Sequence, residues 1–251
     1  MKRLIGKVAL VTGAGQGVGL GIAQAFADAG ALLAISGRRE AVLKSAAENL
    51  IGRGAKVITV VADSRRREDA RKAIDATINA FGRLDILVNN AQSSAPGKPF
   101  SEFDDDSIDQ TIESGLYGTI YHMQEAFPHL KANGGSIINL GSREGIFGGI
   151  GMSIYAATKE AIRGLSRSAA REWGRSGVRV NVLCPAALSP VSVAYLDSHP
   201  DEAKMYLSQT SLGYFGDSLQ DIGPVAVFLA STESRYVTGQ TINADGGQMM
   251  L

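Results

Sequence analysis

The chain has 251 residues, and its 25 Lys and Arg residues balance its 25 Asp and Glu residues. This length allows a large core in a single domain, and zero net charge argues against nucleic acid or an anionic membrane as a partner. The one cysteine, Cys184, excludes an intrachain disulfide and lies in an apolar run, which indicates a buried, unreactive thiol. No apolar run is long enough to cross a membrane, so we expect a cytoplasmic protein.

The first motif is a glycine-rich turn between a strand pattern and a helix pattern. Residues 7–12 are a short β-branched run, and apolar residues recur at helical spacing from residue 22. Glycines at such a turn let the backbone approach a pyrophosphate, and the N–H groups at the helix start bind its charge. We therefore expect a dinucleotide site that includes Thr12, Gly13, Gln16, Gly17, Val18 and Gly19.

The next strand pattern, at residues 31–36, ends in Ser36-Gly37-Arg38-Arg39. A dinucleotide fold that prefers NAD usually carries an acid here to hold the ribose hydroxyls. This chain has no such acid and offers guanidinium groups, so the sequence favours the 2′-phosphate of NADP, with NADP(H) preferred over NAD(H). The alternative is that Arg38 and Arg39 only begin a solvated helix.

Five more strand patterns alternate with helix patterns, at residues 56–62, 84–89, 136–140, 178–184 and 240–244. Such apolar strands predict the α/β class: a doubly wound, seven-stranded parallel sheet with helices on both faces, in a single domain over residues 1–251. Ligands of these sheets bind beyond the carboxyl ends of the strands. Residues 186–219 lack clear periodicity, and a connection this long at that edge predicts a substrate lid.

A candidate acid/base pair lies on one predicted helix, residues 152–176. Tyr155 and Lys159 are four residues apart and therefore share a helix face. A phenol has an ordinary pKa of roughly 10, and a neighbouring ammonium favours its ionised form. The pair is therefore a candidate for proton transfer near neutral pH. The alternative is two solvated residues on an exposed face.

Together these motifs make the chain resemble the short-chain dehydrogenase/reductase family over essentially its whole length. They are Thr12-Gly13-x-x-x-Gly17-x-Gly19, Asp63, Asn89-Asn90-Ala91, Ser142, Tyr155-x-x-x-Lys159, Asn181, Val237-Thr238-Gly239-Gln240 and Asp245-Gly246-Gly247. The resemblance implies a Rossmann-type domain, reversible hydride transfer between NAD(P) and a carbonyl or secondary alcohol, and a homotetramer or homodimer. It implies no metal.

The resemblance also implies roles for individual residues. Tyr155 would be the acid/base, Ser142 would hydrogen-bond the substrate oxygen, and Lys159 would lower the phenol pKa and bind the nicotinamide ribose. The remaining cofactor contacts would come from Asp63 and Ser64 near adenine, Asn90 and Ala91 under the cofactor, and Pro185 and Ala186 near the nicotinamide.

The departures from the family pattern concern the same region. Gln92 stands where the family usually has glycine, Ala186 replaces the glycine after proline, and Pro190 replaces a threonine that Ser189 could substitute. Gly115 replaces an asparagine that, in the family, holds a water linking the lysine to solvent. Glycine inside the helix predicted over residues 108–131 indicates a kink or reserved space, and we expect a water-filled gap there. Arg143 and Glu144 are either an ion pair at the pocket rim or a recognition element for a polar substrate.

The leading interpretation is an NADPH-dependent carbonyl reductase or alcohol dehydrogenase. A 3-oxoacyl-thioester reductase and a nonenzymatic dinucleotide-binding regulator are the alternatives. The substrate cannot be identified from the pocket candidates, which mix aromatic and polar side chains: Phe147, Tyr195, His199, Met205, Tyr206 and Phe215.

Overall fold

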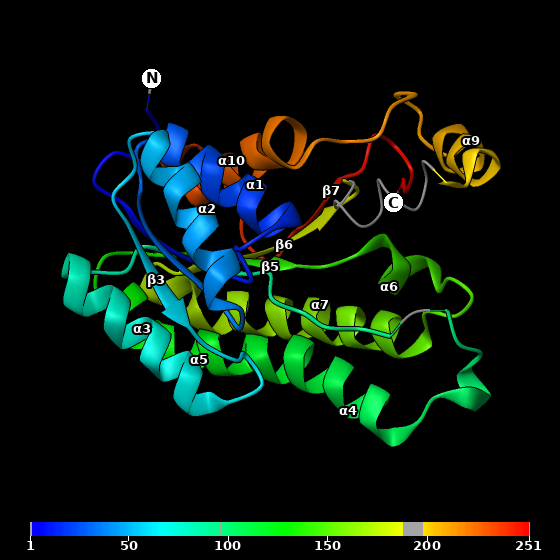
Figure 1. Ribbon diagram of the computed structural model, residues 1–251. Helices are drawn as coiled ribbons and strands as arrows, with labels where there is room; N and C mark the ends of the chain where they lie inside the picture. Colours follow the sequence, from blue (N-terminus) through cyan, green and yellow to red (C-terminus); the bar gives the residue numbers. More distant parts are fainter. Residues whose placement is uncertain (1, 96, 188–197, 251) are drawn as a thin grey trace.

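The chain forms one seven-stranded parallel sheet with helices on both faces (Figure 1). The computed structural model describes residues 2–95, 97–187 and 198–250. All six strand pairs are parallel, in the order β3-β2-β1-β4-β5-β6-β7. The strands are β1 (Val8–Thr12), β2 (Leu32–Gly37), β3 (Val57–Val61), β4 (Ile86–Asn89), β5 (Ser136–Leu140), β6 (Arg179–Pro185) and β7 (Thr241–Ala244).

Each predicted strand is confirmed to within two residues, because short β-branched runs buried on both faces have few other ways to satisfy their backbone. The chain runs outward from β1 to β2 and β3, and then returns to place β4 on the other side of β1. The crevice at this reversal, beyond the carboxyl ends of β1 and β4, is the usual ligand position in such folds.

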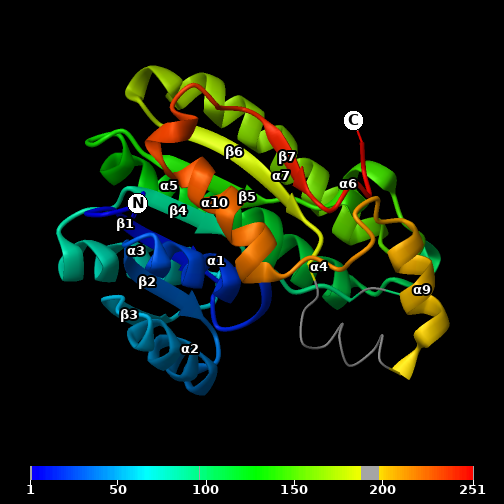
Figure 2. The ribbon, with the colours of Figure 1, turned by 90° about the horizontal axis from the view of Figure 1, so that it is seen from above.

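The helices divide between the two faces of the sheet, as Figures 1 and 2 show. One core cluster joins the sheet to α1 (Gly17–Asp28), α2 (Glu40–Gly52) and α10 (Gly223–Ala230). The other joins it to α3 (Arg67–Phe81), α5 (Gly118–Leu130) and α7 (Ser153–Trp173). The predicted doubly wound, Rossmann-type domain is therefore confirmed. The shorter helical elements are η1 (Phe100–Glu102), α6 (Arg143–Phe147), η3 (Gly174–Ser176) and η5 (Thr232–Ser234).

The long helix predicted over residues 108–131 is interrupted. Helix α4 (Asp105–Ile112) leads into one π-helical turn, η2 (Glu113–Tyr117), before α5 begins. The N–H of Gly118 reaches back five residues to the carbonyl of Glu113, which widens the turn around Gly115. The irregularity expected at this glycine is therefore present, in the form of a π-turn.

The connection at residues 186–219 contains a helix that the sequence analysis did not predict, α9 (Pro200–Ser208), followed by a π-turn, η4 (Ser218–Ile222). Pro200 stands in the first turn of α9, where a missing N–H costs no helical hydrogen bond. Ser189, Pro190 and Tyr195 lie outside the described residues. Within the described part of the chain, no helix has both the length and the apolarity to span a bilayer.

Candidate active site

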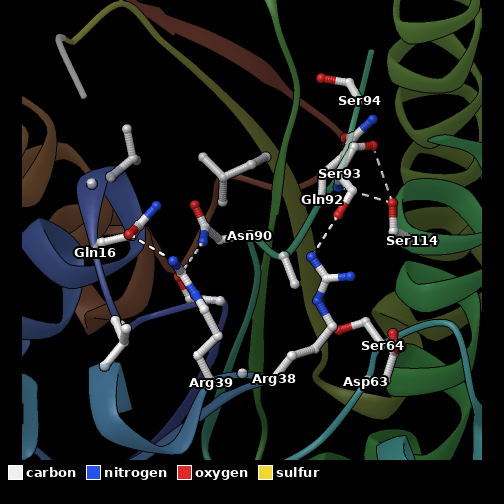
Figure 3. Close-up of a pocket in the computed structure, with 18 of the residues that line it drawn as sticks. Gln16, Arg38, Arg39, Asp63, Ser64, Asn90, Gln92, Ser93, Ser94 and Ser114 are labelled. Carbon is white, nitrogen blue, oxygen red and sulfur yellow. Dashed lines mark hydrogen bonds between the residues drawn. The ribbon is translucent and has the colours of Figure 1, made fainter. Parts of the chain in front are cut away.

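A cavity of about 540 Å³ follows the carboxyl edge of the sheet (Figure 3). It begins at the loop after β1, passes the ends of β2, β3 and β4, and reaches the ends of β5 and β6. An elongated cavity along this edge suits an extended ligand such as a dinucleotide. Fourteen of the residues predicted for the site line it: Gly13, Gln16, Gly17, Val18, Arg38, Arg39, Asp63, Ser64, Asn90, Ala91, Ser142, Tyr155, Lys159 and Pro185.

Thr12 is buried and does not line this cavity. Its hydroxyl oxygen accepts hydrogen bonds from the backbone N–H groups of Asn90 and Ala91, both at 3.0 Å. The side chain of Asn90 donates in return to the Thr12 carbonyl at 2.9 Å. Thr12 therefore ties the glycine loop to the loop after β4, and any effect it has on a cofactor acts through the position of these loops.

Gly19, Ser36 and Ala186 also lie outside the lining of this cavity. A Cβ on Gly19 would lie 2.7 Å from the carbonyl oxygen of Gly13, so glycine is needed there for close packing. Ser36 is buried, and its carbonyl accepts from the N–H of Ala14 at 3.3 Å. Ala186 lines a second cavity, on the side of η4 and β7.

The predicted catalytic residues come together where β5 and α7 meet. Ser142 precedes α6 and caps it, accepting from the N–H of Glu144 at 3.1 Å. Tyr155 and Lys159 lie on one face of α7, with the lysine Nζ 5.4 Å from the centre of the phenol ring. Nζ donates to the carbonyl of Leu140, at the end of β5, at 2.7 Å. The three side chains line the same end of the cavity.

Two arginines line the cavity at the end of β2. Arg38 donates from Nη2 to the hydroxyl of Ser93 at 3.0 Å, and Arg39 donates to the side-chain oxygen of Gln16 at 2.8 Å (Figure 3). Asp63, at the end of β3, pairs with Arg65 at 2.6 Å. Burial alone would raise the pKa of the Asp63 carboxyl, but the hydrogen bonds from Arg65 hold it below the ordinary value. This carboxylate is therefore already neutralised by its own arginine.

The comparisons with known proteins agree with this geometry. A family model described as "Enoyl-(Acyl carrier protein) reductase" matches residues 13–249. The chain is 44% identical over 249 residues to a 12alpha-hydroxysteroid dehydrogenase of a Clostridium species, with 96% of each chain covered. It is 37% identical over 249 residues to an L-fucose dehydrogenase of Oryctolagus cuniculus, covering 98% of this chain and 86% of that one.

A solved structure of a short-chain dehydrogenase also matches nearly the whole chain. A short-chain dehydrogenase from Burkholderia cenocepacia in complex with NADP superposes with a TM-score of 0.90 at 32% identity, covering 98% of this chain and 99% of that one. This chain belongs to the short-chain dehydrogenase/reductase family. It is an NAD(P)-dependent oxidoreductase that acts on a small molecule at a CH–OH or carbonyl group.

The cavity of this short-chain dehydrogenase/reductase fits a nicotinamide dinucleotide. Gly17, at the start of α1, has a φ of +58° and open space around its Cβ position, so the backbone N–H groups of this turn are accessible to a pyrophosphate. The arginines at the end of β2 lie at one end of the cavity, and Ser142 lies at the other. Within the described residues, no group of three or more His, Cys, Asp or Glu side chains could hold a metal ion.

The pKa of Tyr155 differs from the sequence expectation. Burial is the largest effect and raises it above the ordinary value, and the hydrogen bond with Ser142, which lowers it, is the weaker effect. Lys159 is not among the groups that shift the pKa of Tyr155, and burial lowers the pKa of Lys159 itself to about 8. The predicted lowering of the phenol pKa by a fully charged Lys159 is therefore wrong for the protein on its own. Burial also raises the pKa of Cys184 to about 11, as expected for an unreactive thiol.

Arg143 and Glu144 form an ion pair at 3.0 Å, which is the first of the two predicted alternatives. Arg143 also donates to the side-chain oxygens of Gln209, just after α9, at 3.2 Å and of Gln248, in the C-terminal tail, at 3.0 Å. Its guanidinium lies 5.9 Å from the ring centre of Phe147. Arg143 therefore links the residue after α9 and the C-terminal tail to α6, beside Ser142.

Sequence reasoning assigned no ligand role to several lining residues, and none of the described pocket candidates (Phe147, His199, Met205, Tyr206 and Phe215) lines the catalytic cavity. Four of the missed residues follow β4 or lie in η2, namely Gln92, Ser93, Ser94 and Ser114, and no local pattern marks the three serines. Gln92 alone carried a signal, as a departure from the family's glycine. The missed lining residues include Val42, Gln92, Ser93, Ser94, Ser114 and Ala187.

Proposed function

We propose that this enzyme prefers NADP(H) and interconverts a secondary alcohol and a ketone on a large apolar ring system, a hydroxysteroid being the leading candidate. The observation that carries the proposal is one cavity with two arginines at its adenosine end and Ser142, Tyr155 and Lys159 at its other end. Membership in the family and relatives named as dehydrogenases favour an enzyme over a nonenzymatic regulator.

In the proposed reaction, bound NADPH supplies the hydride to the carbonyl carbon. Ser142 and Tyr155 hydrogen-bond the carbonyl oxygen, and Tyr155 donates its proton to that oxygen as the alcohol forms. The raised pKa of the buried phenol keeps it protonated at neutral pH, which is the form required for reduction. Lys159, fixed by the Leu140 carbonyl at 2.7 Å, binds the nicotinamide ribose and supports recovery of the phenol proton.

The preference for NADP(H) rests on unused donors at the end of β2. Arg38 uses one guanidinium nitrogen on the neutral hydroxyl of Ser93, which a phosphate can replace as acceptor. The Asp63 carboxylate forms its ion pair and hydrogen bonds with Arg65, and its interaction with Arg38 is a weaker charge attraction without a hydrogen bond. A hydrogen bond between charged partners contributes roughly 1.5–3 kcal/mol, so we expect NADPH to bind at least about tenfold more tightly than NADH.

The steroid proposal rests on the 44% identical relative named as a 12alpha-hydroxysteroid dehydrogenase and on the surface around the catalytic serine. Phe147 and Ile150, which follow Ser142, are 67% and fully exposed, and Met205 of α9 is 52% exposed. Arg143 donates to the residue after α9, so α6, which carries Phe147, and α9, which carries Met205, are joined next to Ser142. A flat hydrocarbon skeleton would cover these apolar side chains.

We also propose that residues 186–219 act as a lid and that the chain assembles as a homotetramer or homodimer. Arg143 donates to Gln209 at 3.2 Å and to Gln248 at 3.0 Å, and the backbone N–H of Leu212 donates to the Gly246 carbonyl at 3.0 Å. These bonds support closure of this segment onto the tail. The assembly is proposed to form by symmetric pairing of α7 and of the helical run from α4 through η2 to α5, which lies along it in Figure 1. The lone buried Cys184 suits the reducing cytoplasm.

Two measurements test the proposal. NADPH and NADH are titrated into the wild type, Arg38→Asp, and a matched charge change at Arg235, which lies outside the cavity between η5 and β7. We expect the preference for NADPH to reverse only in Arg38→Asp, and equal affinities in the wild type would refute the proposed preference.

NADPH oxidation is then followed with a 12-oxosteroid, a small ketone, a 3-oxoacyl thioester and an enoyl thioester. Faster turnover of either thioester would replace the steroid proposal.

A further inference from the structure

Arg143 and Glu144 are two charged residues beside the catalytic centre that the proposed reaction does not use. They open α6 directly after Ser142, and their side chains are only 20% and 19% exposed. Neither lines the catalytic cavity, so neither is placed to contact the cofactor or the reacting oxygen. Burying a charge costs free energy unless a partner offsets it. A largely buried charge pair at this place is therefore expected to change the electrostatics of the catalytic centre.

The ion pair neutralises Glu144 only in part. Arg143 donates to Oε1 of Glu144 from Nε alone, at 3.0 Å. Its Nη1 donates instead to the side-chain oxygens of Gln209 at 3.2 Å and Gln248 at 3.0 Å. Oε2 of Glu144 accepts no hydrogen bond from the described residues. Because two-bond pairs between a guanidinium and a carboxylate are the strong ones, Glu144 keeps part of its negative charge uncompensated.

The unbonded oxygen of Glu144 lies near the start of the helix that carries the phenol. A Cβ built on Gly149 would collide with Oε2 of Glu144 and would lie 3.7 Å from Cγ of Met152. Met152 directly precedes α7 and stands three residues before Tyr155. Glycine at 149 therefore leaves room for the carboxylate between α6 and the first turn of α7.

The charge of Glu144 acts on the phenol of Tyr155. Burial is the largest effect that raises the pKa of Tyr155, the hydrogen bond with Ser142 lowers it, and the charge of Glu144 raises it further. Cys184 of β6 acts in the same direction, but its own pKa of about 11 keeps the thiol neutral near pH 7. On α7 itself, Nζ of Lys159 lies 5.4 Å from the ring centre. The acids of α4 and η2, which pack against α7, are not among the groups that shift this pKa: Asp105, Asp106, Asp109 and Glu113.

We propose that Arg143 and Glu144 are positioning residues for the acid/base step: Glu144 holds Tyr155 in its protonated form, which favours ketone reduction, and Arg143 offsets part of this effect. Both act through Tyr155 and not by touching the substrate. Because the residue after α9 and the C-terminal tail occupy Nη1 of Arg143, the offset stays partial while these segments are bonded to α6. This inference rests on the proposed role of Tyr155.

The decisive variant is Glu144→Gln, which keeps the size of the side chain and an oxygen that can accept from Arg143 but removes the charge. The pH dependence of kcat/KM is measured for oxidation of a neutral 12-hydroxysteroid at saturating NADP+, because oxidation needs the ionised phenol. We expect the pH at which kcat/KM rises to move down by about half a pH unit, as expected for loss of one nearby charge. Arg143→Met should move it to higher pH. Arg143→Lys, which keeps the charge, should stay nearer the wild type.

The matched controls change another ion pair of α7. Arg163 donates from two guanidinium nitrogens to Glu160, which follows Lys159, at 3.0 and 2.7 Å. Neither residue of this pair acts on the pKa of Tyr155. Glu160→Gln and Arg163→Met should therefore leave the pH dependence within about 0.2 pH units of the wild type. Loss of an ion pair that only supports packing lowers Tm or kcat without moving the pH dependence.

A second readout does not depend on turnover. Tyrosine labelled with carbon-13 at the phenol carbon reports ionisation by NMR, and the signal of Tyr155 is the one missing from Tyr155→Phe. The titration is made on protein with bound NADP+, so the charge of the cofactor is the same in every variant. The pKa obtained from this signal should fall in Glu144→Gln and rise in Arg143→Met.

The outcomes separate this inference from the proposed function. If the wild type turns over and neither readout moves in Glu144→Gln, the inference is refuted and the proposed function stands. If the wild type acts on no alcohol or ketone but the NMR signal shifts as expected, the proposed function fails and the effect of Glu144 on Tyr155 stands. Shifts of the same sign in Glu144→Gln and Arg143→Met, or an equal shift in Glu160→Gln, would also overturn the inference. Opposite shifts with unmoved controls support it.

Discussion

The charge state of Lys159 can be measured through protein stability. Burial lowers the pKa of Lys159 from 10.5 to about 8, a difference worth roughly 3 kcal/mol at about 1.4 kcal/mol per pH unit. The folded protein binds this proton less tightly than the unfolded chain, so the penalty is complete below pH 8 and disappears as pH rises toward 10.5. Roughly 1 kcal/mol of stability should therefore be recovered between pH 7 and pH 9.

The assay is urea unfolding without cofactor, at fixed protein concentration, for the wild type and Lys159→Met. The raised pKa of Cys184, about 11, acts in the opposite direction, because stability falls as the unfolded thiol ionises above pH 9. Because the charge of Lys159 also lowers the pKa of Cys184, both proteins carry Cys184→Ala, and the difference between their pH profiles then isolates Lys159. We expect the wild type to gain stability relative to Lys159→Met from pH 7 to pH 9. Parallel profiles would mean that Lys159 keeps its ordinary pKa, and the argument would fail.

Three further predictions concern the site and the assembly. Tyr155→Phe should lower turnover by at least roughly a hundredfold, as expected for loss of a general acid, with NADPH affinity nearly unchanged in a fluorescence titration; a variant that keeps most of its turnover would exclude Tyr155 as the acid. Gly19→Ala should weaken cofactor binding and lower Tm, because the added Cβ would lie 2.7 Å from the Gly13 carbonyl; calorimetry showing an unchanged Tm would contradict this packing argument. Light scattering at micromolar concentration should give the mass of a dimer or tetramer, and a monomer would count against the proposed assembly.

The fold could be predicted from the sequence because its signals are local. Each strand is a short apolar run with a turn after it, and parallel pairing follows from the helices between the runs. The helix α9 was missed because residues 186–219 lack clear periodicity, although Pro200 stands in the first turn of α9, where proline is favourable. Pro200 was a possible sign of a helix start. In the sequence, however, a proline in the first turn of a helix cannot be told from a proline in a loop unless apolar residues at helical spacing follow it.

The site was predictable where one residue carries the chemistry and not where two distant residues share a space. Tyr155, Lys159 and the glycine loop have fixed local spacing. Gln92 and Gly115 lie on different elements, so each looked like a separate departure until the structure placed the Gln92 amide 3.0 Å from where a Cβ on Gly115 would stand. The water-filled gap expected beside Gly115 is therefore wrong, because this amide takes the room. The direction of the Tyr155 pKa shift also required the structure, because it depends on burial of both the phenol and the lysine.

The most direct test of the central claim is to follow the transferred hydride itself. NADPH carrying deuterium at both hydrogen positions of the nicotinamide C4 is incubated with the wild type and a 12-oxosteroid, and the product is analysed by mass spectrometry and NMR. The account predicts one deuterium on the new carbinol carbon, formed at least roughly a hundredfold more slowly by Tyr155→Phe. A reduced product without deuterium at that carbon, or no reduction of any ketone by a wild type that binds NADPH, would contradict it.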